Sequence, residues 1–123
     1  MKQKQLEILL EKVKGFPKPH VRREQYLTPP PVAAEFLHFA YMHGDLKRVV
    51  YDLGCGTGIL AVGAKLLGAE KVIGIDSDIN ALKLARENAK LLGVEVEFIA
   101  CDVTHAQGTA DTVLMNPPFG AQK

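Results

Sequence analysis

The sequence has 123 residues, 47% of them hydrophobic, and a net charge of +1. This composition fits one globular domain and excludes a disordered chain. No apolar run approaches the roughly 20 residues of a membrane span, and the polar N-terminus does not resemble a signal peptide. Cys55 and Cys101 form no zinc motif and require no disulfide, so we expect a cytoplasmic protein with no membrane partner and no metal.

Positive charge is concentrated at the N-terminus, where residues 1–25 carry seven Lys and Arg against three Glu, a net charge of +4 that leaves −3 for the remainder. Such a basic arm is typical of a surface that meets phosphate, and a solvated amphipathic helix explains the same charges equally well. A helix is predicted over residues 3–14, ending at Gly15. Its repeating apolar positions are Leu6, Leu9, Leu10 and Val13.

A proline-rich, irregular stretch over residues 15–30 follows this helix. We therefore predict two units, an N-terminal helix with a basic, proline-rich segment (1–30) and a cofactor-binding domain (31–123). The domain is expected to begin with a helix over residues 31–42, because Pro31 suits a first helical turn. The predicted apolar face of that helix consists of Val32, Phe36, Phe39 and Ala40.

Short apolar runs then alternate with segments of helical periodicity. The predicted strands are residues 48–53, 71–76, 95–100 and 111–115, and the predicted helices are residues 57–67 and 78–92. The alternation predicts an α/β fold with a Rossmann-like, doubly wound, mostly parallel sheet. The fourth strand should lie beside a central first strand. It would then form an uncovered apolar edge, so we expect the domain to be C-terminally incomplete, with its last strands absent from this chain.

The segment Asp52-Leu53-Gly54-Cys55-Gly56-Thr57-Gly58 joins the first predicted strand of this sheet to a helix. Glycines allow a sharp turn there and let a ligand lie against the backbone, while the helix N-terminus offers N–H groups to an anion. A nicotinamide loop would place its third glycine at the sixth position, whereas here it falls at the fifth. This spacing resembles an S-adenosylmethionine loop, and a simple turn would need fewer glycines. The candidate cofactor-binding residues are Asp52, Gly54, Gly56 and Gly58.

Two further strand ends carry candidate cofactor-binding residues. Asp76 ends the second predicted strand, where a carboxylate can accept both ribose hydroxyls, although it could instead cap the following helix. Asp102 and Val103 follow the third strand. There the Asp102 carboxylate could accept from the adenine amine and the Val103 N–H could donate to a ring nitrogen, unless they are ordinary residues after a strand.

The segment Asn116-Pro117-Pro118-Phe119 directly follows the fourth predicted strand. The exocyclic amine of a base is a poor nucleophile because its lone pair is delocalised into the ring. The Asn116 side-chain oxygen and the Pro117 carbonyl could accept its two N–H bonds and favour rehybridisation. Phe119 offers a ring on which the base can stack. We therefore predict Asn116, Pro117 and Phe119 as catalytic residues, the alternative being a proline turn with one buried aromatic side chain.

These motifs resemble those of class I methyltransferases that modify amines. The series Gly15-Phe16, Lys18-Pro19, Glu24-Gln25-Tyr26-x-Thr28 and Met115-Asn116-Pro117-Pro118-Phe119-Gly120 is similar to the methyltransferase-like protein 5 family and its archaeal relatives. The resemblance implies methylation of the N6 amine of an adenosine in small-subunit ribosomal RNA. It also implies that Gln25, Tyr26 and Thr28 close over the cofactor, S-adenosyl-L-methionine, and that a small zinc-binding activator protein is a partner.

Two alternatives remain open at this point. Protein methyltransferases that act on glutamine amides use the same planar-nitrogen logic, so the Asn-Pro-Pro-Phe segment alone does not identify the substrate. A cofactor-binding but inert fragment is the other alternative, because the family continues well beyond this segment. The basic arm and Phe119 favour a nucleic-acid base over a protein amide.

Overall fold

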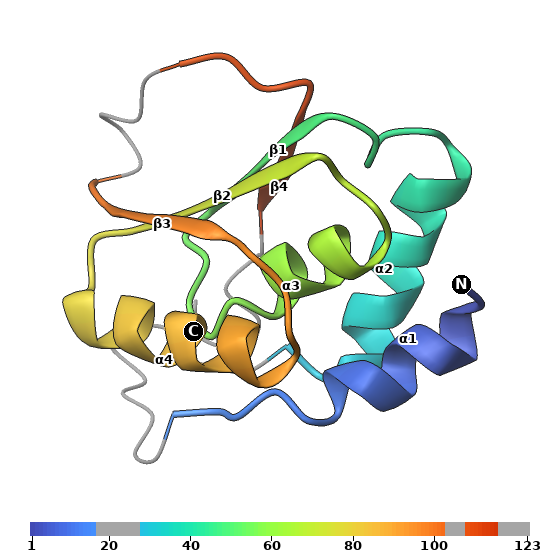
Figure 1. The fold of residues 1–123 in the computed structure, drawn as a ribbon, viewed down its shortest axis with the longest axis horizontal. Helices are drawn as coiled ribbons and strands as arrows, with labels where there is room; N and C mark the ends of the chain where they lie inside the picture. Colours follow the sequence, from blue (N-terminus) through green and yellow to red (C-terminus); the bar gives the residue numbers. More distant parts are fainter. Residues whose placement is uncertain (17–27, 103–107, 116–123) are drawn as a thin grey trace, which may run out of the picture.

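The computed structural model describes residues 1–16, 28–102 and 108–115. Its strands form one parallel sheet in the order β3-β2-β1-β4 (Figure 1). The strands are β1 (Val49–Leu53), β2 (Lys71–Asp76), β3 (Glu97–Ala100) and β4 (Thr112–Met115). The helices are α1 (Gln3–Leu10), α2 (Pro30–Met42), α3 (Ile59–Leu66) and α4 (Ile79–Leu91). The predicted α/β fold is confirmed, with β4 beside β1.

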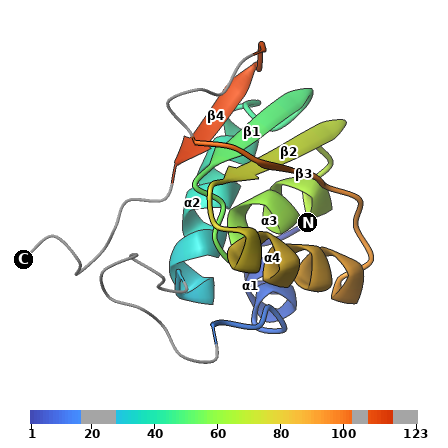
Figure 2. The same cartoon turned by 90° about the vertical axis from the view of Figure 1, so that its left-hand side faces the viewer.

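All four helices lie on the same side of the sheet, as the two views of Figures 1 and 2 agree. The register aligns Val50 with Val72 and Asp52 with Leu114, so these residues share the face that the helices cover. Within the described part of the chain, β4 pairs only with β1. The outer face of β4 carries the exposed side chains Val113 and Met115.

The predicted element boundaries agree with the structure to within a few residues. Residues 71–76 match β2, and α2 begins one residue earlier than predicted, at Pro30. The other strands and helices are shorter than predicted by one to four residues, as is usual at element ends. The largest difference is in α1, which ends at Leu10 and not at residue 14. Beyond it the Lys12 and Val13 amides donate to carbonyls three residues back, which is a tighter turn than an α-helix.

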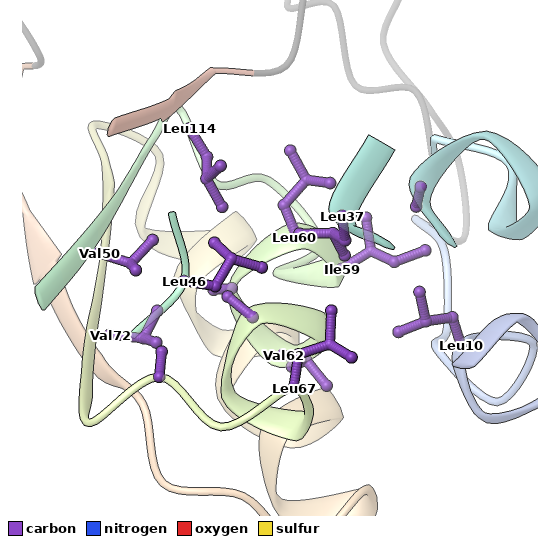
Figure 3. Packing of buried hydrophobic residues seen from close by; sticks show 14 of the residues in the cluster. Leu10, Leu37, Leu46, Val50, Ile59, Leu60, Val62, Leu67, Val72 and Leu114 are labelled. Atoms are coloured by element: carbon purple, nitrogen blue, oxygen red, sulfur yellow. The ribbon is translucent and has the colours of Figure 1, made fainter. Parts of the chain in front are cut away.

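The core lies between the sheet and the helices (Figure 3). Val50, Val72 and Leu114 project from the strands toward α3, which lies between the sheet and α1 and α2. Leu6 and Leu10 of α1 are fully buried in the same cluster. The N-terminal helix and the sheet therefore share one hydrophobic core, and the unit boundary at residue 30 stays a prediction.

The predicted apolar face of α2 is wrong apart from Ala40. The buried residues of α2 are Ala33, Ala34, Leu37 and Ala40, whereas the side chains of Val32, Phe36 and Phe39 are exposed, Phe39 to 64%. This helix is apolar around much of its circumference, so periodicity does not choose a face. Close packing against α1 and α3 decides it, and small side chains allow that approach. No helix in the described part of the chain is long and apolar enough to cross a membrane.

Candidate functional site

The glycine-rich segment lies at the edge where β1 and β2 end. The Gly54 and Cys55 amides both donate to the Ile75 carbonyl of β2, at 2.7 and 3.0 Å. The Gly58 amide donates to the Cys55 carbonyl at 2.8 Å, which closes the turn before α3. The loop is thus fixed to the carboxyl edge of the parallel sheet, where ligands of such folds bind.

All three glycines of this loop have positive φ, with values of 68° at Gly54, 53° at Gly56 and 83° at Gly58. Other residues adopt this backbone only with strain. Gly58 also packs closely against α4, because a Cβ there would lie 3.0 Å from the Cβ of Ala85. At Gly54, by contrast, a Cβ would meet no atom of the described residues within 4 Å. The loop therefore presents bare backbone to open space, which fits a ligand lying against it.

Asp52 is the buried carboxylate beneath this loop. It is the penultimate residue of β1 and only 1% exposed, and its Oδ2 accepts from the Ala61 amide in the first turn of α3 at 3.1 Å. Among the described residues, its Oδ1 accepts no hydrogen bond. Burial raises the pKa of Asp52 to about 7; the Ala61 hydrogen bond opposes this shift and the nearby Asp76 adds to it. An unsatisfied buried oxygen beside an open loop fits a site that receives a donor from a ligand.

Asp52 should make stability depend on pH. Its folded pKa lies above the usual 3.8, so the folded state holds the proton more tightly, and stability is lost as pH rises from about 4 through about 7. The loss should reach roughly 4 kcal/mol, at about 1.4 kcal/mol per pKa unit. Asp52→Asn should remove this part of the slope. Urea unfolding of both proteins between pH 5 and pH 8 measures it, and parallel profiles would refute the role of Asp52.

Asp76 ends β2 and ties the loop to the next helix. Its Oδ2 accepts from the Gly56 amide and its Oδ1 from the Asp78 amide, both at 2.9 Å. The cap of α4 is Asp78, whose Oδ1 accepts from the Asn80 amide at 2.9 Å. The alternative that Asp76 caps α4 is therefore wrong, because Asp78 fills that position. Asp76 is left at the strand end, beside Gly56.

Cys55 lies within the same loop and is buried. Burial raises the pKa of its thiol, and the charges of Asp52 and Asp76 raise it further. A thiol held in its neutral form is a weak nucleophile. Cys55 serves as a packing residue instead, in a small cluster with Leu82 and Ala85 of α4 and Phe98 of β3.

The structure brings together part of the predicted site. One loop at the carboxyl edge contains Gly54, Gly56 and Gly58, and the carboxylates of Asp52 and Asp76 lie beside it. Thr28 is buried just before α2, and Asp102 is exposed after β3. The other predicted residues lie outside the described part of the chain: Gln25, Tyr26, Val103, Asn116, Pro117 and Phe119.

Sequence reasoning overlooked Asn88. It is fully buried on α4, and its side-chain amide donates to the Thr57 carbonyl of the glycine loop at 2.9 Å. A signal was available, because Asn88 lies on the same helical stripe as the buried residues Ala81 and Ala85 and is a poor helix former. A polar residue in an apolar stripe indicates a buried hydrogen-bond partner.

A hollow of about 520 Å³ lies away from this loop. It is lined near the amino ends of β2 and β3 by residues of both charges, including Lys71 and Glu97, whose side chains form an ion pair at 3.9 Å. The four Lys or Arg and three Glu residues that line it nearly balance, so charge alone does not select an anion or a cation there. Over residues 1–16, 28–102 and 108–115, no three His, Cys, Asp or Glu side chains gather to hold a metal ion.

Comparison with known families identifies the family to which the chain belongs. The model of the methyltransferase small domain matches residues 33–123, which include the loop, Asp76 and β4. The chain belongs to the methyltransferase small domain family. This methyltransferase small domain is 38% identical, over 99% of the chain, to rRNA N(6)-adenosine-methyltransferase METTL5 of Danio rerio. The resemblance to the methyltransferase-like protein 5 family is thereby confirmed.

Solved structures of two similar proteins agree with this fold. A candidate RNA methyltransferase from Pyrococcus horikoshii superposes with a TM-score of 0.91, at 44% identity over 100% of this chain. An RNA methyltransferase from Salinibacter ruber, in complex with S-adenosyl-L-homocysteine, superposes with a TM-score of 0.65 at 36% identity over 73% of the chain and 60% of its own length. The present chain spans 62% of the Danio rerio protein and 61% of the Pyrococcus horikoshii chain.

The name of one further relative points to a protein substrate. A candidate protein N5-glutamine methyltransferase of Methanocaldococcus jannaschii is 39% identical over 77 residues, 61% of this chain and 39% of its own length. This match covers much less of the chain than the match to the Danio rerio protein.

Proposed function

We propose that the domain binds S-adenosyl-L-methionine and that the protein methylates the N6 amine of an adenosine in small-subunit ribosomal RNA. The observation that supports this cofactor is the open loop of three positive-φ glycines, which lies beside the carboxylates of Asp52 and Asp76. The substrate rests on the match to METTL5, which covers nearly the whole chain. The cofactor supplies a methyl group already activated on a sulfonium, so positioning of the two reactants should supply most of the rate.

Charge at the loop favours this cofactor over a dinucleotide. Asp52 is buried and Asp76 half-buried at one sheet edge, and the field of each raises the pKa of Cys55. S-adenosylmethionine brings a sulfonium and an ammonium to such a site, whereas a nicotinamide dinucleotide brings an anionic pyrophosphate. Asp76, together with the ionised fraction of Asp52, would attract the first and repel the second. The unsatisfied Asp52 Oδ1 is suited to a donor carried by the ligand.

The remaining predicted residues take their roles as parts of this proposal. Asp76 accepts the ribose hydroxyls, and Asp102 with Val103 binds the adenine ring. A second group closes over the cofactor from the N-terminal side and comprises Gln25, Tyr26 and Thr28. The target amine is held by Asn116 and Pro117, and its base stacks on Phe119.

Asp76→Ala tests the cofactor site directly. It should raise the dissociation constant of S-adenosyl-L-homocysteine about ten- to a hundred-fold, since hydrogen bonds to a charged group contribute roughly 1.5–3 kcal/mol. Asp111→Ala is the matched control, because that carboxylate accepts from the Val49 amide at the opposite edge of the sheet. Calorimetry measures both variants. Equal affinities would remove Asp76 from the site, and binding of NAD in place of the homocysteine product would refute the proposed cofactor.

The match to the glutamine methyltransferase makes a second substrate worth testing. A planar amide nitrogen poses the same chemical problem as an exocyclic base amine. Transfer of a labelled methyl group to purified ribosomal RNA should be compared with transfer to a release-factor protein. Label in RNA nucleosides that co-migrates with N6-methyladenosine supports the main proposal, and label in protein alone would replace it with the alternative.

The basic arm should contribute to RNA affinity. Reversing the charges of Lys18, Arg22 and Arg23 should weaken binding and flatten its salt dependence, by roughly one unit of slope per lost phosphate contact. The control reverses Lys83 on α4, which is exposed and outside the arm. Filter binding from 50 to 300 mM salt measures affinity and slope together. An unchanged slope would mean that the arm is only a solvated surface.

Two finer expectations belong to the same proposal. A small zinc-binding activator protein is the proposed partner, by resemblance to the methyltransferase-like protein 5 family. The proposed location is the cytoplasm, where a reducing environment suits the two free thiols, Cys55 and Cys101.

A further inference from the structure

Asn88 joins three separate parts of the chain through one side chain. It lies in the last third of α4, with none of its side chain exposed. Its Oδ1 accepts from the Lys14 amide at 2.8 Å, and its Nδ2 donates to the Lys14 carbonyl at 3.0 Å. The same Nδ2 donates to the Thr57 carbonyl at 2.9 Å. In the view of Figure 1 the segment that follows α1 runs below α4.

The side chain is matched to these partners. An amide offers two N–H donors and a carbonyl acceptor, and Asn88 uses both donors and its oxygen. Aspartate would keep the acceptor for the Lys14 amide but would turn a charge toward two carbonyls. A hydrophobic residue would leave Lys14 and Thr57 without their partner. Asparagine is unfavourable inside a helix, so these contacts and not helix propensity account for its position.

Thr57 lies between two loop glycines, and α4 holds this end of the loop at two places. Ala85, one turn before Asn88, is the residue against which Gly58 packs. Asn88 then fixes the Thr57 carbonyl. Any ligand that selects one conformation of the Gly54–Gly58 loop therefore also favours one orientation of the Asn88 amide, and with it the two hydrogen bonds to Lys14.

We propose that Asn88 is a positioning residue that couples cofactor binding at the glycine loop to docking of the N-terminal segment at Lys14. The inference rests on the proposed function, because it needs a ligand on the loop. Coupling between two sites is reciprocal, so the ligand tightens the segment as much as the docked segment tightens the ligand. Neither Lys14 nor Asn88 needs to touch the ligand for this coupling.

Amide exchange at Lys14 tests the coupling in the wild-type protein. Saturating S-adenosyl-L-homocysteine should slow exchange of the Lys14 N–H, measured by NMR, by about ten-fold, which corresponds to about 1.4 kcal/mol. A purely structural Asn88 would give exchange that does not depend on the ligand. Absence of any binding would refute the proposed function, whereas binding with unchanged Lys14 exchange would refute only the coupling.

Asn88→Asp supplies the second measurement. It should raise the dissociation constant of S-adenosyl-L-homocysteine about ten-fold and abolish the effect of the ligand on Lys14 exchange. Asn80→Asp is the matched control, because it adds the same charge to α4 at an exposed position. Equal affinities of the two folded variants would overturn the proposal. If Asn88→Asp does not fold, the wild-type exchange measurement decides.

Discussion

Replacing Asn116 with alanine is expected to lower the rate of methyl transfer by about 10²–10³ while leaving cofactor affinity nearly unchanged. Asn116 is proposed to hold the target amine and not the cofactor. Its hydrogen bond therefore strengthens as charge develops on nitrogen, and its loss acts mainly on the transition state. Single-turnover transfer to ribosomal RNA with the full-length protein measures the rate, and calorimetry with S-adenosyl-L-homocysteine measures the affinity.

Phe119→Ala separates positioning of the amine from stacking of the base. It should weaken RNA binding as well as turnover, because stacking contributes about 1–3 kcal/mol per base. The control for Asn116→Ala is Asn80→Ala, which removes an asparagine side chain from the exposed first turn of α4. Wild-type rates in Asn116→Ala would show that the Asn-Pro-Pro-Phe segment is structural, and the proposed amine chemistry would fail.

The contact between Leu37 and Gly63 should be the most sensitive point of the core. Leu37 of α2 is fully buried, and a Cβ on Gly63 of α3 would overlap its Cδ1. Leu37→Ala should cost about 2–5 kcal/mol through the lost contacts and the cavity. Gly63→Ala should cost about 1–3 kcal/mol by overpacking, which outweighs the gain of up to about 1 kcal/mol in helix propensity.

The double variant, Leu37→Ala with Gly63→Ala, tests whether overpacking against Leu37 is what destabilises Gly63→Ala. With Leu37 shortened, the new methyl group at residue 63 has space, so the double variant should be more stable than the sum of the single changes predicts, by about 0.5–3 kcal/mol. Leu91→Ala, at an exposed position at the end of α4, should change stability by less than about 0.5 kcal/mol. Urea unfolding measures all four variants. Strict additivity would show that the two helices relax independently of this contact.

The order of elements and the cofactor loop were predictable because their signals are local. Alternation of apolar runs and helical stripes identifies the strands and helices, and glycines at positive φ leave a mark in the sequence itself. Boundaries were predicted less accurately, as α1 shows, because the last turn of a helix depends on hydrogen bonds that several residue types can make. The acidic positions beside the loop, Asp52 and Asp76, follow from their places at the carboxyl ends of β1 and β2.

The sequence by itself determined the parallel α/β fold, the edge at which the loop lies and the residues that form it. Only the tertiary structure decided which face of α2 is buried and what Asn88 binds. An apolar helix gives no periodicity that favours one face, so the close approach of α3 at Gly63 makes that choice. Likewise Asn88 acquires its role from Lys14, 74 residues away, because hydrogen bonds between distant segments exist only after the chain has folded.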